Sequence, residues 1–223
     1  MAAKLAVAKG AKQTVPPPAA RLSRRRNRER DVVEAALRVF YDKGYSQATM
    51  QDIADSLGML KGSIYHYIDS KEDLLYRVLA LVHDDVDAIL ADVAGLEGIA
   101  PWEQLRTYVR RMAAYSALNL AWITVYYNDL DRLSDSRYKE LLPRRRAHER
   151  FVADTIQRAS AVDGAAGERD ATLMTNFAFG ALLWIYRWYR PGGKVEVESL
   201  ADACADFVVR GAGGPPAVGV TKR

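Results

Sequence analysis

The sequence is poor in cysteine and has no long apolar run. Its 223 residues include one cysteine, Cys204, which excludes an internal disulfide bond. No stretch of 18 consecutive uncharged apolar residues occurs, so we expect no transmembrane helix. Lysines interrupt the short apolar stretch at the start, and three prolines follow it, which is unlike a secretory signal. We therefore expect a cytoplasmic protein without membrane contact.

Signatures of catalysis and of metal binding are also missing. The sequence has no Gly-x-Ser-x-Gly motif, P-loop or dinucleotide-binding fingerprint, and its three histidines have no spacing that suggests catalysis. His83 and Asp87 stand four residues apart, which would suit a metal, but no second group of ligands accompanies them. We interpret this pair as part of a solvated helix face. We expect no metal, no cofactor and no enzymatic activity.

Positive charge is concentrated at the N-terminus. The chain has a net charge of +4, and residues 1–30 contain nine lysines and arginines but one acid. The remainder is slightly acidic, with 23 basic and 27 acidic residues. We expect residues 1–22 to form a flexible basic arm, because they are rich in alanine, lysine and proline and lack periodicity. A basic end on a near-neutral body suggests contact with an anionic polymer, and a solubilising tail is the alternative.

Helical periodicity runs through the rest of the sequence. Val33, Ala36, Leu37 and Phe40 recur at three- and four-residue spacing, which is typical of one helix face. Similar stripes continue almost to the C-terminus, with glycines and prolines between them. No internal repeat and no convincing strand occurs. The sequence therefore predicts an all-α protein of about nine helices.

Two short helical patterns meet at a glycine in the first third of the chain. Thr49 can cap the first of them, and Gly58 ends it and permits a sharp reversal. The second, "KGSIYHYI" at residues 61–68, has Ile64 and Ile68 to anchor it, while its other side chains are small, polar or aromatic. This division of side chains is typical of the second helix of a helix-turn-helix unit. One face of that helix packs on its own helical bundle, and the other enters the major groove of DNA.

The polar face of this unit supplies the candidate DNA contacts. We expect the arginine run before the first helix to reach the minor groove or the backbone, and Tyr67 has packing in the core as its alternative role. The candidates are Arg24, Arg25, Arg26, Lys61, Gly62, Ser63, Tyr65, His66, Tyr67 and Lys71.

Residues 28–75 resemble the DNA-binding domain of TetR-family repressors. The resemblance rests on Gly44-Tyr45, Thr49, Ile53-Ala54 and the run from Tyr65 to Leu75 that reads Y-x-x-x-x-S-K-E-x-L. It implies a homodimer on a palindromic double-stranded DNA operator, released by a small-molecule inducer. It also implies that Thr49, Tyr65, Tyr67 and Lys71 hold phosphates while Lys61, Gly62, Ser63 and His66 face bases. The chain departs from the family pattern at Tyr67-Ile68, where histidine and phenylalanine are usual.

The resemblance also implies that the remaining helices form a ligand pocket and, from the last two, a dimer interface. We expect a helix-turn-helix domain at 23–70, a ligand-binding and dimerisation domain at 71–212 and a disordered tail at 213–223. The helix that begins at Ser70 should join the two domains. Apolar stripes in the last two helices supply the candidate interface residues, for which an intramolecular core is the alternative: Phe177, Ala181, Leu200, Cys204, Phe207 and Val208.

Aromatic rings beside polar and basic groups mark the candidate ligand site, at Tyr126, Tyr127, Asn128, Arg132, Trp184, Arg187 and Trp188. Such a set suits a planar or apolar ligand with an anionic group. The segment "RWYRPGG" resembles a TetR subgroup that includes repressors of steroid-ring and fatty-acid catabolism, which implies an acyl-CoA inducer. Alternatively, the two tryptophans belong to the dimer core.

Two other functions stay open at this point. The protein could be a sequence-independent nucleic-acid binder, which would bind random DNA as well as an operator at a fixed salt concentration. It could also be a helical small-molecule-binding enzyme, which would need a perturbed acid–base pair or a metal in its cavity.

Overall fold

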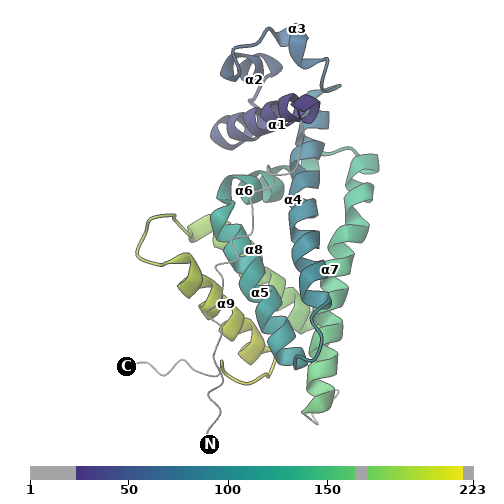
Figure 1. Ribbon diagram of the computed structural model, residues 1–223, viewed down its shortest axis with the longest axis vertical. Coiled ribbons are helices and arrows are strands. Elements are labelled where there is room, and N and C mark those ends of the chain that lie inside the picture. Colours follow the sequence, from purple (N-terminus) through teal and green to yellow (C-terminus); the bar gives the residue numbers. More distant parts are fainter. Residues whose placement is uncertain (1–23, 164–169, 218–223) are drawn as a thin grey trace, which may run out of the picture.

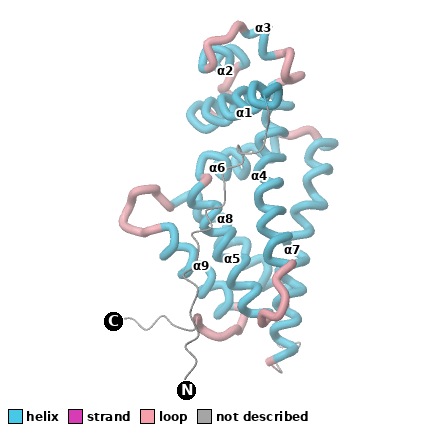
Figure 2. Tube along the Cα trace, viewed as in Figure 1, coloured by secondary structure: helices cyan, strands magenta, loops and turns pink. Residues whose placement is uncertain are grey.

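The computed structural model describes residues 24–163 and 170–217. This part of the chain consists of nine α-helices and one short 3₁₀ helix joined by loops, with no strand (Figure 2). The predicted all-α class is confirmed. The helices are α1 (Arg24–Lys43), α2 (Met50–Ser56), α3 (Lys61–Ile64), α4 (Lys71–Ala94), α5 (Pro101–Leu118), α6 (Leu120–Asp129), η2 (Leu130–Arg132), α7 (Asp135–Val162), α8 (Ala171–Trp188) and α9 (Val197–Gly211).

The molecule is elongated, with two regions joined by a long helix. Helices α1, α2 and α3 form a small group at one end, which we call the head (Figure 1). Helices α5 to α9 form the larger body, in which α5 packs against α9, α7, α4 and α8. Helix α4 starts in the head and runs down through the body beside α7, while α6 packs against α1. The head is therefore connected to the body through α4, and α1 of the head packs against α6 of the body.

Local signals explain the boundaries of the head helices. Gly44 and Gly58 have φ angles of 76° and 62°, so both adopt the left-handed conformation that the glycine positions predicted. Thr49 caps α2 in a full capping box with Asp52, and the Ser70 side chain caps α4. Helix α4 begins directly after Ser70, where the sequence predicted its start.

Helix α3 is shorter than predicted. The sequence pattern suggested a helix over residues 61–68, whereas the α-helix ends at Ile64 and a turn follows. Leu60 occupies its N-cap and makes no side-chain hydrogen bond, and Gly62 is a weak helix former, so little favours extension of the helix. Ile64 and Ile68 are 0% and 2% exposed, which confirms them as the anchors of the segment.

Arg24, Arg25 and Arg26 form the first turn of α1, whereas the prediction placed them before that helix. Their proposed contact with DNA stays a prediction. The predicted basic arm at residues 1–22 lies outside the described residues.

The C-terminal tail is more ordered than predicted, as far as Ala217. The Arg106 guanidinium donates to the Pro215 carbonyl, and the Ala217 amide donates to Asp206. Gly214 packs so tightly that an added Cβ would lie 2.6 Å from a Val209 methyl carbon. Residues 213–217 therefore belong to the body, which corrects the predicted disordered tail.

Across the described ranges, none of the helices combines the length and the apolarity needed to cross a membrane.

Candidate nucleic-acid interface and interior cavity

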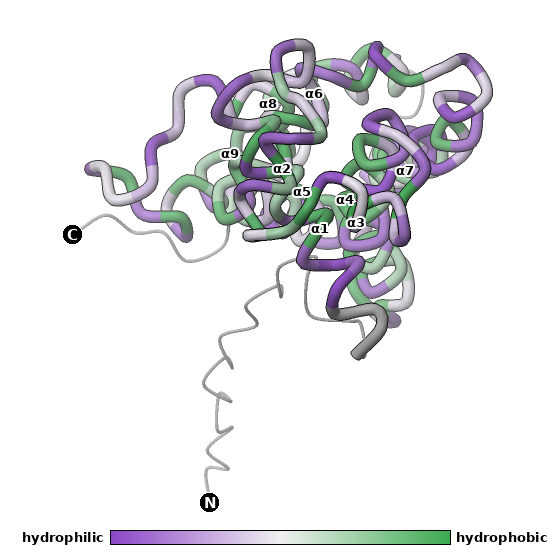
Figure 3. Tube along the Cα trace, turned by 90° about the horizontal axis from the view of Figure 1, so that it is seen from above, coloured by the Kyte–Doolittle hydropathy of each residue, from purple (hydrophilic) through white to green (hydrophobic). Residues whose placement is uncertain are grey.

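The outer surface of the head presents polar side chains that have no partner within the described residues. Lys61, Gly62, Tyr65 and His66 are exposed, and Ser63 is half-buried. No hydrogen bond or ion pair from their side chains occurs in the described part of the chain, and a Cβ at Gly62 would meet nothing within 4 Å. Figure 3 looks onto this end of the molecule, where hydrophilic segments alternate with hydrophobic ones. These five residues therefore form one accessible face at α3, as the helix-turn-helix prediction requires.

Two of the predicted phosphate contacts serve the head itself. The Thr49 hydroxyl donates to an Asp52 carboxylate oxygen at 2.8 Å and accepts from the Asp52 amide at 3.1 Å. Hydrogen bonds from Lys43 and then Thr49 lower the Asp52 pKa to about 2. Tyr67 is half-buried and packs against the apolar core, which agrees with its alternative role. Contacts of Thr49 and Tyr67 with phosphate stay predictions.

Lys71, the first residue of α4, holds the loop between α1 and α2. Its ammonium donates to the Ala48 carbonyl at 2.6 Å and to the Ser46 carbonyl at 3.3 Å. It also lies 4.5 Å from the centre of the Tyr45 ring. Burial lowers the Lys71 pKa, opposed by the charges of Asp129 and Asp52. Because two of its three N–H groups already have partners, Lys71 fixes the head on α4, and one donor at most remains for a phosphate.

The body contains a cavity of about 300 Å³ enclosed by α4 to α8. Its walls are mainly apolar, from Val82, Met112, Ile123, Phe179 and Leu182 among others. Its polar lining residues are His83, Ser116, Tyr126, Tyr127, Arg145, His148, Glu149 and Asn176. An apolar pocket with a few converging polar groups is the usual form of a small-molecule site.

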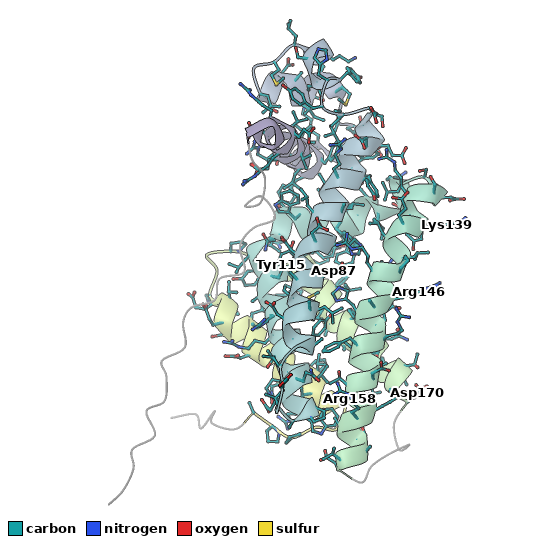
Figure 4. The ribbon with its side chains drawn as sticks, turned by 45° about the vertical axis from the view of Figure 1, so that its right-hand side comes forward. Asp87, Tyr115, Lys139, Arg146, Arg158 and Asp170 are labelled. Atoms are coloured by element: carbon teal, nitrogen blue, oxygen red, sulfur yellow. The ribbon has the colours of Figure 1, made fainter. Side chains whose placement is uncertain are left out.

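One chain of polar contacts links α5, α7 and α4 across the cavity wall. The buried Tyr108 hydroxyl lies 2.7 Å from His148 Nδ1, and His148 Nε2 lies 2.9 Å from an Asp87 oxygen. The other Asp87 oxygen accepts from Arg144 Nε at 2.6 Å. Burial acts to raise the Asp87 pKa, but the hydrogen bonds from His148 and Arg144 leave it below its ordinary value. Figure 4 marks Asp87 in the middle of the bundle, whereas Arg146 points away from it on the outer side of α7.

His83 is 3% exposed, so the prediction that it lies on a solvated helix face was wrong. Its Nε2 lies 3.0 Å from the Tyr126 hydroxyl, and the two rings meet edge to face. Burial, followed by the charge of Arg144, lowers the His83 pKa to about 4. The imidazole is therefore neutral near pH 7. Among the described residues, no group of three His, Cys, Asp or Glu side chains is placed to hold a metal ion.

The structure places the predicted ligand residues in three locations. Tyr126 and Tyr127 line the cavity, and their contact with a ligand stays a prediction. Asn128 is exposed and accepts from the Tyr186 hydroxyl at 3.3 Å, and Arg132 is paired with Asp131 at 3.7 Å. Neither of these two side chains lines the cavity.

The other predicted ligand residues lie on the outer face of α8. Trp184 and Trp188 are 62% and 49% exposed, and the Arg187 guanidinium lies over the Tyr186 ring. This corrects the grouping of the two tryptophans with Tyr126 and Tyr127. The outer location agrees with the alternative, in which the tryptophans belong to a dimer surface.

An apolar face on α8 and α9 gathers several of the predicted dimer residues. Its members are Phe177, Ala181, Trp184, Trp188 and Phe207, which border one hollow on the surface. Phe177 and Phe207 are 60% and 67% exposed, and so large an apolar patch is typical of an interaction surface. We call these five residues the α8–α9 face.

The other three predicted dimer residues lie deeper in the chain. Leu200 and Val208 are each 5% exposed, because α9 turns them toward the interior of its own chain. Leu200 follows the alternative of an intramolecular core, whereas Val208 also borders the hollow of the α8–α9 face. Cys204 is half-buried, and burial raises its pKa to about 11, so its thiol stays protonated at neutral pH.

Sequence reasoning missed most of the polar groups in the cavity. His83 could have been found, because it interrupts the apolar stripe of Leu75, Leu79, Val82 and Val86 on α4. Arg145 and His148 lie within a strongly charged stretch of α7, and nothing in their spacing distinguishes them from the solvated residues around them.

Comparisons with known proteins match both regions. Residues 32–78 match the family model for bacterial regulatory proteins of the tetR family, and residues 98–212 match that for the tetracyclin repressor-like C-terminal domain. The HTH-type transcriptional repressor KstR2 of Rhodococcus jostii strain RHA1 is 29% identical over 205 residues, which cover 90% of this chain and 98% of the relative.

Two solved structures are similar over most of their length. The ketosteroid transcriptional regulator KstR2 of Mycobacterium tuberculosis superposes with a TM-score of 0.75 at 25% identity, covering 82% of this chain and 94% of the other. AibR, solved in complex with isovaleryl coenzyme A and operator DNA, has a TM-score of 0.73 at 25% identity and covers 81% and 97%.

Proposed function

Because this chain belongs to the TetR family of bacterial regulators, we propose that it is a cytoplasmic transcriptional repressor that binds operator DNA as a homodimer and is released by an acyl-CoA. The observation that carries the proposal is the division of the molecule. An accessible polar face at α3 lies at one end, a largely apolar cavity that is partly open to solvent lies in the body, and α4 runs from one to the other.

The head is suited to the major groove of DNA. The N-terminal part of α3 carries the exposed Lys61 and the half-buried Ser63, from which base edges and phosphates can be reached. One head of this size covers few base pairs, so specific binding requires two heads, about 34–36 Å apart or a multiple of that spacing. About six phosphate contacts per dimer would reduce affinity roughly a thousandfold between 50 and 200 mM salt.

The α8–α9 face supports the homodimer. Phe177 and Trp184 on α8 and Phe207 on α9 expose most of their side chains in a single chain. A second copy related by a twofold axis would cover the same residues with the same surface. Helices α8 and α9 lie in the body, away from α3 at the tip of the head, so pairing through them leaves both heads free (Figure 1).

The cavity supports an acyl group as the buried part of the inducer. Its volume of about 300 Å³ is at the lower end of the range for small-molecule sites, so it suits an acyl chain and excludes a whole coenzyme A. Apolar walls such as Val86 and Ile123 suit the chain. Arg145, Glu149 and Asn176 are more exposed members of the lining and mark where the polar carrier would leave the cavity.

Helix α4 provides the connection between ligand and DNA. Its 24 residues span about 36 Å, with Lys71 fastened to the head and Val82, His83 and Val86 in the cavity wall. Arg137 on α7 donates to Asp73 at 3.2 Å, so α7 is tied to the same end of α4. A ligand that prefers the form whose heads are wrongly spaced for DNA will increase the population of that form and so weaken DNA binding. The shift can be no larger than the ratio of the ligand's affinities for the two forms.

A DNA-binding measurement tests the proposal. An operator selected from random duplexes is titrated with the protein at fixed salt, alone and with acyl-CoAs of increasing length, free coenzyme A or the free acid. We expect an acyl-CoA to weaken operator binding at least tenfold and the other two to have little effect. Equal affinity for random DNA would support a sequence-independent binder, and chemical conversion of the acyl-CoA would support an enzyme.

A cavity-filling variant connects the effect to the proposed site. Met112→Trp should abolish the response to acyl-CoA while operator affinity stays the same, because Met112 lines the cavity and not the head. Leu118→Trp is the matched control, since Leu118 lies on the same helix but is 54% exposed and outside the cavity lining. If both variants still respond fully, the inducer binds elsewhere.

A further inference from the structure

The head carries one apolar side chain that neither its core nor its helix explains. Leu60 lies in the turn between α2 and α3 and is 81% exposed, more than any other large apolar side chain among the described residues. The apolar anchors beside it, Ile64 and Ile68, are buried. Exposure of this degree means that Leu60 contributes almost nothing to the folded core.

Leu60 is also an unfavourable residue for its place in α3. It is the N-cap of that helix, with φ −71° and ψ 140°, and its side chain makes no capping hydrogen bond. In the same chain Thr49, Ser70 and Asp170 cap α2, α4 and α8 through their side-chain oxygens. Serine, threonine, aspartate and asparagine are strongly preferred at this position over leucine. Ala100 and Glu196 also leave the N-caps of α5 and α9 without a side-chain hydrogen bond. Leu60 differs in that it neither caps its helix nor packs in the core, so the fold alone does not explain it.

Contact between subunits does not supply that reason. The exposed aromatic residues of the α8–α9 face, such as Trp184 and Phe207, lie together in the body and can cover one another in a dimer. Leu60 lies at the far end of the molecule, beside α3 (Figure 1). Its immediate neighbour Lys61 and the nearby His66 are exposed polar residues, so it does not extend an apolar patch.

The major groove offers one apolar group that would suit Leu60. The N-terminal residues of the second helix of a helix-turn-helix unit face base edges, and Leu60 directly precedes that helix. Those edges carry hydrogen-bond donors and acceptors, and thymine adds a C5-methyl group, which apolar side chains contact. Burial of Leu60 against that methyl removes two apolar surfaces from water.

We propose that Leu60 reads a thymine, through its C5-methyl group, once in each half of the operator. The inference rests on the proposed function, because it requires α3 to lie in the major groove. It assigns to Leu60 a part of sequence specificity in addition to the polar contacts of Lys61 and Ser63.

Replacement of thymine by uracil isolates the methyl group, because uracil lacks the methyl and keeps the same hydrogen-bonding edge. The full-length dimer is titrated against the selected operator with each thymine changed in turn to uracil, in one half-site and then in both. At one position, loss of the methyl should weaken binding about fourfold per half-site and about 15-fold for both, the value for one buried methyl-sized group. Changes at other thymines should have smaller effects.

Two variants connect that position to Leu60. Leu60→Ser should bind thymine and uracil operators equally, while its unfolding midpoint stays the same or rises, because serine caps α3. This result separates recognition from folding. Val162→Ser is the matched control, since Val162 is 76% exposed at the end of α7 in the body. It should keep the full preference for thymine.

The outcomes separate this inference from the proposed function. A methyl preference that disappears in Leu60→Ser and remains in Val162→Ser supports the assignment. Specific operator binding without a methyl preference, or with a preference that Leu60→Ser retains, overturns it and leaves the repressor intact. Absence of any sequence-specific binding overturns both.

Discussion

The head and the body of this regulator differ in whether their polar side chains have partners within the chain. On the head, Lys61, Tyr65 and His66 extend into solvent without a partner among the described residues. In the body, His148 has both ring nitrogens in contact with other side chains, Tyr108 and Asp87. Unpaired polar groups at the surface are available to an external partner, whereas paired ones inside fix the shape of a cavity. The comparison shows that the two sets of polar side chains are separate, so the proposed recognition of DNA and of the ligand would use different residues.

The largest effect is expected from a substitution in the body that reduces DNA binding by the head. Trp184→Glu places a charge on the α8–α9 face, where we expect the partner subunit. The variant should be monomeric in sedimentation and should lose at least about a hundredfold in operator affinity, because one head alone covers half a site. Val162→Glu, on an exposed site outside that face, is the control. A monomeric variant with full affinity would show that the heads act independently.

Two histidines allow a comparison of the regions by pH. Because the His83 pKa is lowered to about 4, the unfolded chain takes up a proton below about pH 6.5 and the folded chain does not. The free energy of unfolding is therefore highest, as far as His83 is concerned, above pH 6.5, where the imidazole is neutral in both states. It should decrease by about 3 kcal/mol as the pH falls toward 4.

Urea unfolding between pH 7 and pH 4 measures this effect. His83→Gln should have a weaker pH dependence than the wild type over that range. His66→Gln, which changes an exposed ring in the head, should follow the wild type. If the free energy of unfolding depends on pH identically in the wild type and His83→Gln, then His83 takes up a proton as readily in the folded as in the unfolded state.

Lys71 lies where the two regions meet, and its replacement distinguishes positioning from phosphate contact. Lys71→Met removes two charge-assisted hydrogen bonds to Ser46 and Ala48, so urea unfolding should show a loss of about 2 kcal/mol. If Lys71 only positions the head, operator affinity falls while its salt dependence stays the same. If it also binds phosphate, the slope of log affinity against log salt decreases by about 1 per subunit.

A smaller effect is expected from a change confined to the body. Gly214→Ala would place a Cβ 2.6 Å from Val209 Cγ1 and 2.7 Å from the Trp102 ring, both of them buried. The crowding should reduce stability by about 1 kcal/mol, measured by urea unfolding. Operator affinity and the response to acyl-CoA should remain unchanged. A weaker response to acyl-CoA would mean that the tail is coupled to the cavity.

The sequence predicted the head better than the body, because the head depends on local signals. Gly58, Thr49 and Ser70 act within a few residues of their own positions, and each boundary they predicted is present. The role of Lys71 was missed because its carbonyl partners lie 23 and 25 residues earlier in the chain. No local pattern indicates such a contact.

The cavity was only partly predictable, because five helices that are separated in sequence enclose it. Tyr126 and Tyr127, which were predicted as ligand residues from their aromatic character, line the cavity. Trp184 has the same character, yet it lies outside, since the rotation of α8 in the bundle decides which face points inward. That rotation results from packing between distant helices, which periodicity within one helix does not determine.

Helix α8 serves two surfaces at once, since Asn176 and Gly180 border both the interior cavity and the hollow of the α8–α9 face. A substitution there would alter the choice of effector and the pairing of subunits together. Positions on α5 and α6 such as Met112 and Ile123 border the cavity and not that hollow. Divergence or redesign of the sensor toward new metabolites should therefore proceed through α5 and α6, while α8 changes slowly.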